Sequence, residues 1–334
     1  MADRVRIGVI GVGMIGELHA RFVAQRIGEA ELVAVADADT ARAAAVAGAL
    51  GGATVHADGP ALIADPHVAA VLIASPDGTH ADLTRACLAA GKPVLCEKPL
   101  ATSVAAAWEV VTAERATGRR LIQLGFMREF DPPHAAVRAA VAADRLGDVV
   151  LVRSVHVNRD RGGRQPTYAE TIVNSIIHDI HSARFLSGRE IVEVDARSVP
   201  YAPDAPETCR FLTISCTLDD GSLALLDVNC ESGYGYRVWA EVVGTRASAT
   251  TADPAPAILA ADGVLGSAVP PGFRERFEEA YFLQDAAWVR SLVTGVPVGP
   301  SAWDGYAALA VADAAIASVR EGRRVRVEMR DRPS

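Results

Sequence analysis

The sequence is poor in the features that mark several special classes of protein. Aromatic residues make up only 5% of its 334 residues, and it contains no run of about 18 apolar residues, the length that a membrane-spanning helix needs. The five cysteines form no C-x-x-C pair, which favours reduced thiols over disulfides. The first residues, MADRVRIGVIG, lack the apolar region and cleavage site of a secretory signal. We therefore expect a cytoplasmic protein that makes no contact with a membrane.

An excess of basic charge is also missing. Lysine and arginine total 33 against 41 aspartates and glutamates, which gives a formal net charge of -8 and a pI near 5.5. Since no cluster of basic residues offers a footprint for phosphate backbones, we expect no nucleic-acid partner. Half of the residues are hydrophobic, and the chain is long enough for two domains that each bury a core.

The first part of the chain alternates between two kinds of segment. Short β-branched runs are separated by alanine-rich stretches long enough for one helix each. Such alternation predicts a parallel sheet with helices on both faces, and we assign this α/β domain to residues 1–124. The expected strands are RIGVI, ELVAVAD, AAVLIAS, KPVLCEK and RLIQLG.

The remainder, residues 125–334, has a different hydrophobic period. Longer runs with a period of two residues predict a mostly antiparallel sheet, into which a helix over 174–186 is inserted. The segment 252–272 is rich in Ala, Pro and Gly and predicts a loop. Further elements are expected as helices near 273–294 and 303–320 and a terminal strand, RRVRVE.

The same runs place apolar side chains on the sheet face that no helix is expected to cover. The positions are Phe211, Leu225, Val238 and Trp239. A large exposed apolar patch usually marks an interface, so we expect a homodimer or homotetramer.

The amino-terminal stretch IGVIGVGMIGELHA contains the spacing G-x-G-x-x-G, directly after a strand and at the start of a helix. Gly11 permits a tight turn, Gly13 lets the backbone approach a pyrophosphate, and Gly16 lets the helix pack on its strand. Backbone N–H groups around Met14 and Ile15 would meet the phosphates at the positive end of the helix dipole. The alternative is a structural glycine turn without a nucleotide.

Asp37 ends the second strand, 21 residues after Gly16. A carboxylate there accepts hydrogen bonds from the ribose hydroxyls of adenosine and repels a 2′-phosphate. This position favours NAD over NADP as the cofactor, although the nearby Arg42 weakens the preference.

Two further motifs follow strands, at the rim where open α/β sheets bind ligands. They are SPDGTH, at Ser75–His80, and CEKPL, at Cys96–Leu100. With the glycine fingerprint, GFMREFDP and NSIIHDIHSARFLSG, they make the whole chain resemble the Gfo/Idh/MocA family of oxidoreductases, and within it the inositol 2-dehydrogenases. The resemblance implies a Rossmann NAD(P)-binding domain followed by an α/β domain with an open-faced sheet for substrate binding and oligomerisation.

The resemblance also implies roles for the residues of these motifs. The expected cofactor contacts outside the glycine turn and Asp37 are Ser75, Pro76, His80, Glu97 and Lys98. Glu97 would contact the nicotinamide ribose, and Lys98 would reach both the nicotinamide and the substrate hydroxyl. Pro99, commonly preceded by a cis bond in the family, would aim the lysine. A solvated surface lysine is the alternative for Lys98.

The segment NSIIHDIH, residues 174–181, allows three interpretations: a metal site, a catalytic relay, or polar residues of a buried helix. On a regular helix Asn174 and His178 share a face. The resemblance places His178 on the family's catalytic histidine, whereas Asn174 and His181 replace the usual aspartates. Histidine titrates near neutral pH and suits a general base, so we assign that role to His178 and expect Lys98 to orient the hydroxyl, with swapped roles as an alternative. No second ligand cluster converges, so no metal is expected.

An amide at position 174 supplies no charge, so we predict a lower pKa for His178 than in relatives that carry the aspartate. Asn174 belongs to the expected catalytic group and can hydrogen-bond either the substrate or the ring of His178. Asn158 and Tyr236 are further candidate substrate contacts, although each is equally suited to a structural role. The leading hypothesis is an NAD-dependent dehydrogenase that acts on a secondary hydroxyl of a cyclitol or sugar, with myo-inositol or a close relative as substrate. The alternatives are a ketosugar reductase and a non-catalytic regulator that senses dinucleotide.

Overall fold

The carboxyl-terminal helices divide the chain into two units that are not contiguous in sequence. The structure is a computed structural model that describes all residues except 1–3, 160–161, 253–258, 262–263 and 333–334. Unit 1 consists of residues 1–127, 281–307 and 331–334, and unit 2 consists of the remainder. This division differs from the two contiguous ranges that we expected, because each of the two carboxyl-terminal helices contributes residues to both units.

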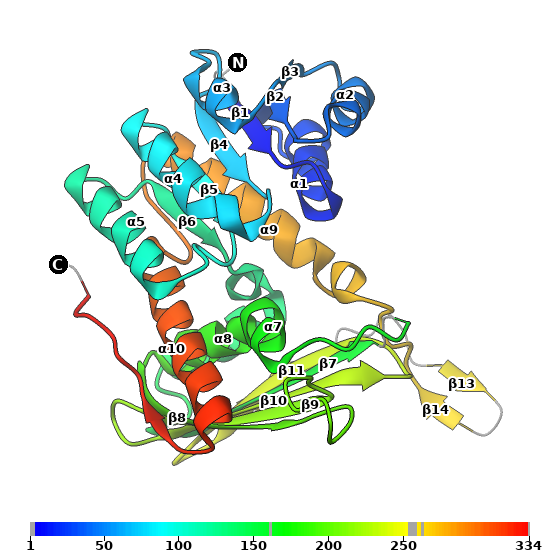
Figure 1. The fold of residues 1–334 in the computed structure, drawn as a ribbon, viewed down its shortest axis with the longest axis vertical. Coiled ribbons are helices and arrows are strands. Elements are labelled where there is room, and N and C mark those ends of the chain that lie inside the picture. The colour runs from blue at the N-terminus through cyan, green and yellow to red at the C-terminus, as the bar shows by residue number, and fades with distance from the viewer. Residues whose placement is uncertain (1–3, 160–161, 253–258, 262–263, 333–334) are drawn as a thin grey trace. The chain divides into compact units, whose positions relative to one another are not determined.

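Unit 1 is built on a six-stranded parallel sheet with the order β3-β2-β1-β4-β5-β6 (Figure 1). Every residue of β4 and β5 is buried, as expected when helices cover both faces of a parallel sheet. The run TVH, which forms β3, is too short to show a period and was not among the expected strands. The strands are β1 (Val5–Ile10), β2 (Ala30–Ala36), β3 (Thr54–His56), β4 (Ala70–Ile73), β5 (Val94–Glu97) and β6 (Ile122–Gly125).

Side-chain caps define where several of the helices in unit 1 begin. Asp39, Asp58 and Ser103 each accept a hydrogen bond from a backbone N–H three residues further on, which satisfies one of the donors that a helix start leaves unpaired. The helices between the strands are α1 (Met14–Gln25), α2 (Thr40–Ala49), α3 (Gly59–Ala64), α4 (His80–Ala89) and α5 (Val104–Ala116), with short 3-10 turns η1 (Asp77–Thr79) and η2 (Met127–Phe130).

Unit 2 contains a seven-stranded sheet with the order β12-β11-β7-β10-β9-β8-β15. Its central pair, β7 and β10, is parallel, and the other pairs are antiparallel. The mostly antiparallel sheet predicted from the two-residue period is therefore confirmed. The strands are β7 (Val149–Arg159), β8 (Ile191–Val199), β9 (Phe211–Leu218), β10 (Leu223–Ser232), β11 (Arg237–Gly244), β12 (Ser248–Thr250) and β15 (Val325–Arg326).

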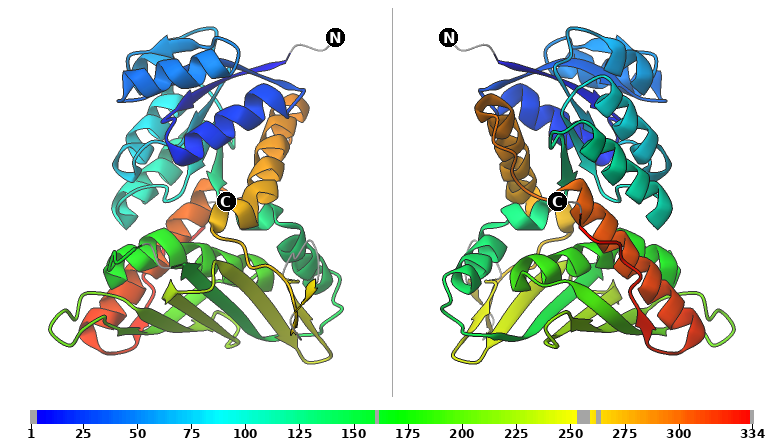
Figure 2. Two further views of the ribbon diagram at one scale, coloured as in Figure 1. Left: turned by 90° about the vertical axis from the view of Figure 1, so that its right-hand side faces the viewer. Right: turned by 90° about the vertical axis from the view of Figure 1, so that its left-hand side faces the viewer.

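One face of this sheet is covered by helices and the other is open. Figure 2 shows the helices of unit 2 on a single side of the sheet. Along β10, Leu226 and Val228 are buried on that side, whereas Leu223 is 44% exposed on the other. Val238, which we expected on the open face, is only 1% exposed. Side chains alternate along a strand, so Val238 and its neighbour Trp239 point to opposite faces.

The helices of unit 2 depart from expectation in one segment. Instead of a regular helix over 174–186, the chain forms α7 (Tyr168–Thr171), a π-helix η3 (Ile172–Ile176) and α8 (Ile177–Ser187). The remaining helices are α6 (Pro132–Ala142), α9 (Phe273–Thr294) and α10 (Ala302–Glu321), and the last two confirm the predicted carboxyl-terminal pair.

The segment predicted as a loop over 252–272 contains a short hairpin of β13 (Leu259–Ala261) and β14 (Val264–Gly266). Its residues 253–258 and 262–263 lie outside the described part of the chain. No helix among the described residues is long and apolar enough to cross a membrane.

Candidate active site

The turn from β1 into α1 has room for a ligand at only one of its three glycines. Gly11 has a φ of +81°, and a Cβ there would lie 2.4 Å from the backbone nitrogen of Ser75. A Cβ on Gly16 would lie 1.7 Å from the carbonyl oxygen of Gly11. At Gly13, by contrast, nothing lies within 4 Å of the Cβ position. The following Met14 is 60% exposed, so the start of α1 presents open backbone that fits a pyrophosphate.

The carboxylate of Asp37 lies beside this turn. Its oxygens accept hydrogen bonds from the backbone N–H groups of Val12 and Asp39, both at 2.8 Å. The guanidinium of Arg42 donates to it at 2.6 Å. Burial favours the neutral acid, but the hydrogen bonds outweigh burial and lower the pKa of Asp37. A negative group at the end of β2 is therefore present, as the ribose-binding position requires.

The SPDGTH loop follows β4. Its Ser75 side chain hydrogen-bonds the Thr79 hydroxyl at 2.6 Å, and Pro76 is exposed. His80 is only 1% exposed. Its Nδ1 lies 2.7 Å from the carbonyl oxygen of Pro99 and its Nε2 lies 2.8 Å from that of Ser75. Because both ring nitrogens are used within the chain, His80 has no hydrogen bond left for a cofactor, contrary to our expectation.

The Glu97-Lys98-Pro99 turn lies at the carboxyl end of β5, and its Lys98–Pro99 peptide bond is cis. Glu97 is buried, whereas Lys98 is half-buried. The backbone N–H of Lys98 donates to the Glu97 carboxylate at 3.3 Å. A half-buried lysine at this edge differs from the solvated surface lysine that we considered as an alternative.

His19, which sequence analysis did not single out, lies between the carboxylate of Glu97 in this turn and the carboxylate of Asp285. His19 on α1 places Nδ1 2.6 Å from an Asp285 oxygen and Nε2 3.4 Å from a Glu97 oxygen. Asp285 lies in the part of α9 that belongs to unit 1. The only local signal was His19 itself, at the end of the glycine fingerprint, since nothing near it in sequence indicates its partner.

In unit 2 the π-helix η3 ends immediately before Ile177, and it contains Asn174. Asn174 is exposed, and His178, in the first turn of α8, is 7% exposed. Since a π-helix has its hydrogen bonds between residues five apart, the four-residue spacing of these two side chains is not that of a regular α-helix. Single π-turns inside helices are frequent at functional sites.

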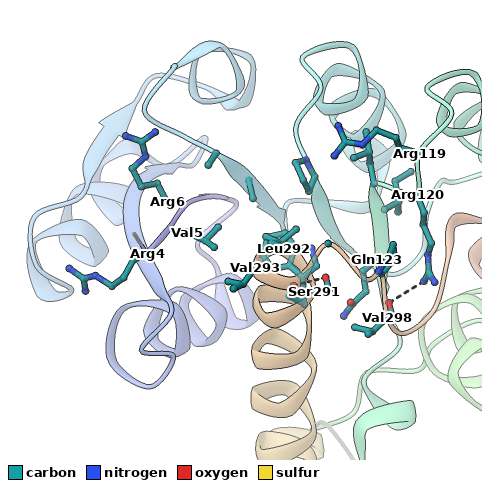
Figure 3. Close-up of a pocket in the computed structure, with 18 of the residues that line it drawn as sticks. Arg4, Val5, Arg6, Arg119, Arg120, Gln123, Ser291, Leu292, Val293 and Val298 are labelled. Carbon is teal, nitrogen blue, oxygen red and sulfur yellow. Dashed lines mark hydrogen bonds between the residues drawn. The ribbon is translucent and has the colours of Figure 1, made fainter. Parts of the chain in front are cut away.

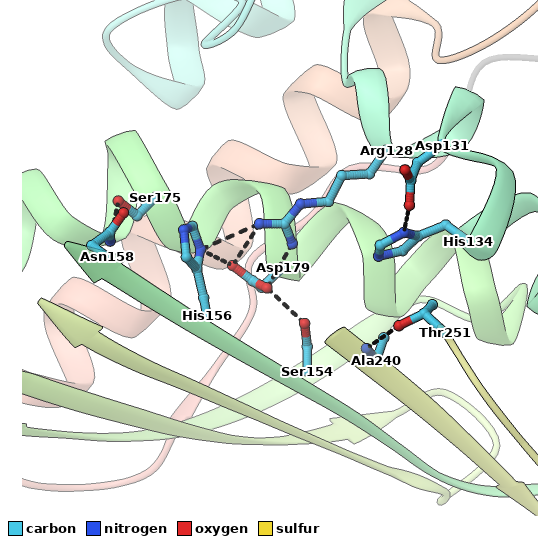
Figure 4. Close-up of polar contacts among 10 residues, drawn as sticks. All are labelled: Arg128, Asp131, His134, Ser154, His156, Asn158, Ser175, Asp179, Ala240 and Thr251. Atoms are coloured by element: carbon cyan, nitrogen blue, oxygen red, sulfur yellow. Dashed lines mark hydrogen bonds and ion pairs between the residues drawn. The ribbon is translucent and has the colours of Figure 1, made fainter. Parts of the chain in front are cut away.

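A buried ionic network anchors α8 next to His178 (Figure 4). The carboxylate of Asp179 accepts hydrogen bonds from Arg128 and Ser154, both at 2.6 Å, and lies 2.9 Å from Nδ1 of His156. Burial opposes ionisation of Asp179, but Arg128 and His156 outweigh it and hold the pKa of Asp179 well below its usual range. An acid with so many donors fixes the rotation of the helix that carries His178.

The remaining candidate residues of unit 2 are engaged within the unit. The side-chain amide of Asn158 donates to the Ser175 hydroxyl at 3.3 Å. Tyr236 is 5% exposed, and its ring meets that of His156 edge-on at 5.4 Å. His181 contacts Glu129 through Nε2 at 2.8 Å. Asn158 is thus hydrogen-bonded to Ser175, the residue after Asn174, and Tyr236 packs against His156 of the ionic network.

The metal-site interpretation and a cavity in unit 1 are alternatives for a ligand site. Among the residues that the structure describes, no group of three or more His, Cys, Asp or Glu side chains is arranged to hold a metal ion. A cavity of about 760 Å³ in unit 1 is lined by the amino-terminal ends of strands and by α9, including Arg6, Leu121 and Val293 (Figure 3). Ligands of open α/β sheets bind at the carboxyl ends of the strands, so this cavity is not the dinucleotide site.

A parallel sheet with an open glycine turn, an acid after β2 and a lysine after β5 defines a dinucleotide-dependent oxidoreductase. Residues 5–126 match the oxidoreductase family with an NAD-binding Rossmann fold, and residues 134–250 match the GFO/IDH/MocA carboxyl-terminal domain. The chain belongs to the GFO/IDH/MocA family.

Relatives in this family are similar over their whole length. The chain is 44% identical to an inositol 2-dehydrogenase of Rubrobacter xylanophilus, across 100% of this chain and 96% of the relative. It is 42% identical to inositol 2-dehydrogenase 1 of Saccharopolyspora erythraea, across 99% and 98%. Among solved structures, myo-inositol dehydrogenase from Lactobacillus casei in complex with NAD(H) and myo-inositol has a TM-score of 0.93 at 28% identity, covering 99% of each chain.

Proposed function

We propose that this oxidoreductase is an NAD-dependent dehydrogenase that oxidises a secondary hydroxyl of a cyclitol, with myo-inositol as the first candidate substrate. The observation that carries the proposal is the Glu97-Lys98-Pro99 turn with its half-buried lysine at the carboxyl end of β5, in the sheet that also carries the open Gly13 turn. The relatives named inositol 2-dehydrogenase support the substrate class.

The cofactor contacts are assigned on the geometry of unit 1. Backbone N–H groups from Gly13 to Ile15 would hold the pyrophosphate, and Asp37 would accept the ribose hydroxyls. Glu97 would hold the nicotinamide ribose. When bound, NAD supplies the acceptor for the hydride that leaves the substrate carbon.

Two side chains carry the proton chemistry in this proposal. Lys98 donates a hydrogen bond to the reacting hydroxyl and stabilises negative charge on its oxygen as the proton leaves. His178 takes that proton, as a group with an ordinary pKa of about 6.5 does well at neutral pH. Asn174 hydrogen-bonds either a substrate hydroxyl or the His178 ring.

Two alternatives use the same residues differently. A ketosugar reductase would run the reaction in reverse, with His178 returning the proton. A regulator that senses dinucleotide without chemistry needs neither Lys98 nor His178, and both are present. We therefore prefer the enzyme to the regulator.

The test is NADH formation by purified protein with NAD⁺ or NADP⁺ and a panel of inositols, inosamines and pyranoses. We expect turnover with NAD⁺ on at least one inositol. The Lys98→Ala variant should lose at least about a hundredfold in kcat while still binding NAD in calorimetry. Lys92, the only other lysine, donates to the carbonyl of Asp65, and Lys92→Ala is the matched control. Full activity of Lys98→Ala would contradict the proposed centre.

We also propose that the enzyme is a homodimer or homotetramer in the cytoplasm. The open face of the unit 2 sheet supports the first point, because it exposes apolar side chains such as Phe211 and Leu223 that association would bury. The five free thiols support a reducing compartment. Mass measured by sedimentation at micromolar concentration should exceed the 35.0 kDa of one chain, and a monomer would refute the proposed assembly.

A further inference from the structure

Buried histidines contact the Glu97-Lys98-Pro99 turn at both of its ends. His19, on α1, faces the side chain of Glu97, and His80, at the start of α4, faces the carbonyl of Pro99. Both rings are inaccessible to water. Burial penalises a charged imidazole, so the groups around each ring decide whether it is protonated.

The partners of His80 require a charged ring. Both are backbone carbonyl oxygens, of Pro99 and Ser75, and a carbonyl only accepts hydrogen bonds. A neutral imidazole has one N–H, so two such bonds need the imidazolium. Burial lowers the pKa of His80, but Cys96 and the two carbonyls outweigh it and raise the pKa to about 10. One cation thus connects the loops that follow β4 and β5.

The partners of His19 are two carboxylates. Asp285 receives the short bond from Nδ1 and Glu97 lies at Nε2. The rings of His19 and Tyr281 form a T-shaped pair with centroids 5.7 Å apart. Burial again opposes the charge, and the two acids outweigh it, so that the pKa of His19 rises to about 10. The imidazolium holds one Glu97 oxygen, and the other faces the backbone N–H of Lys98.

We propose that His19 and His80 are positioning residues of the reaction centre, two buried imidazolium groups that fix the turn from both ends and thereby aim Lys98. The proposal rests on the function proposed above, in which Lys98 meets the reacting hydroxyl. The two histidines have separable effects. His19 orients the Glu97 carboxylate and therefore governs the affinity for NAD. His80 holds the carbonyl of Pro99, the residue that follows Lys98, and therefore governs kcat.

The kinetic test compares variants at each ring with a matched control. In His80→Phe, which keeps a ring but removes both donors, we expect kcat to fall by about ten- to a hundredfold, the scale of a misplaced catalytic group, with NAD affinity within about threefold. His80→Gln retains amide donors and should lose less. His19→Gln should weaken NAD binding in calorimetry by about tenfold and change kcat less. The control is His56→Gln, which removes the last side chain of the edge strand β3, a histidine paired with Asp65 at 3.1 Å, and should change neither quantity.

A direct measurement of the protonation state is independent of turnover. In ¹⁵N NMR of the intact free protein, both ring nitrogens of His80 should carry a hydrogen, and their shifts should stay constant from about pH 6 to about pH 9. A His80 ring that titrates in this interval, or His80→Phe and His80→Gln with unchanged kcat, would overturn the proposal. Should wild-type protein oxidise no inositol, the proposed function fails, while the NMR spectra and the NAD affinity of His19→Gln still decide the positioning role.

Discussion

At the scale of single residues, we expect Arg42 and Asp37 to determine how strongly the protein distinguishes NAD from NADP. The guanidinium lies 2.6 Å from the carboxylate, so it offsets the charge that repels a 2′-phosphate and can itself bind that phosphate. In Arg42→Ala we expect the ratio of kcat/KM for NAD over NADP to rise by about tenfold. Steady-state kinetics with both cofactors measures it, and Arg85→Ala, which removes another surface arginine paired with acids, serves as the control. An unchanged ratio would show that Arg42 has no part in the choice.

The side chain of Asn174 is an uncharged amide at the position where relatives carry an aspartate. A carboxylate in its place favours the imidazolium form of a nearby histidine. Asn174→Asp should therefore raise the pKa of His178, by up to about one unit, and shift the lower limb of the pH profile of kcat/KM to higher pH by the same amount. In the wild type, NMR titration should place the pKa of His178 below about 7. A value above this, or no shift in the variant, would contradict the role assigned to Asn174.

At the scale of elements, two glycines of the β1–α1 turn are expected to have different roles: Gly16 in helix packing and Gly13 in ligand binding. A Cβ on Gly16 meets the Gly11 carbonyl, whereas one on Gly13 meets nothing. Gly16→Ala should destabilise unit 1, because α1 can no longer lie against the turn, by about 2 kcal/mol or more. Gly13→Ala should fold with nearly wild-type stability and bind NAD at least about tenfold more weakly, because the methyl group occupies the space left for the pyrophosphate.

Urea unfolding and NAD calorimetry measure the stability and the NAD affinity of Gly13→Ala and Gly16→Ala. Gly28, in the exposed turn after α1, also has open space around its Cβ position, and Gly28→Ala controls for adding a methyl group on the exposed surface. Equal effects of Gly13→Ala and Gly16→Ala on stability would refute the distinction between them.

At the scale of the whole molecule, buried acids of unit 2 make the fold sensitive to low pH. Asp131 lies 2.5 Å from His134 and 2.8 Å from Arg276 (Figure 4 shows the first contact). Burial raises its pKa, but His134 and Arg276 outweigh burial and lower the pKa of Asp131 to about 2. An acid with a lowered pKa stabilises the fold above its unfolded pKa of about 4, and this contribution, about 2 kcal/mol, is lost as the pH falls toward 2.

Asp131→Asn should therefore lower the free energy of unfolding at pH 7 by about 3 kcal/mol, since it also leaves the buried Arg276 without its counter-charge. The difference from wild type should shrink below about pH 4. Urea unfolding as a function of pH measures both. Glu241→Gln, which breaks an exposed pair with Arg153, should cost less than about 1 kcal/mol. A difference for Asp131→Asn that is independent of pH would show that its charge is not the cause.

Contacts between residues far apart in sequence explain most of what sequence analysis missed. His19 and Asp285 are separated by 266 positions, and Arg128 and Asp179 by 51, so no local pattern connects them. The π-helix at 172–176 also escaped prediction, because its residues have the periodicity and propensities of an α-helix, and only packing selects the wider turn. Val238 was placed on the wrong face because the strand's apolar residues include adjacent positions, which a two-residue period cannot assign.

By itself, the sequence determined the features that depend on contiguous residues: the glycine turn with Asp37, the Glu97-Lys98-Pro99 turn, the alternation of strands and helices in unit 1, and through them the family. These features follow from local geometry. A turn with φ of +81° at Gly11 requires a glycine at that position, and the Glu97-Lys98-Pro99 turn consists of three consecutive residues, so both can be recognised from a short stretch of sequence. Only the tertiary structure decided which groups surround His19 and His80, the network around Asp179 and the division of the chain into units. Each of these depends on burial and on partners from other elements, and a side chain's charge is set by what surrounds it once folded.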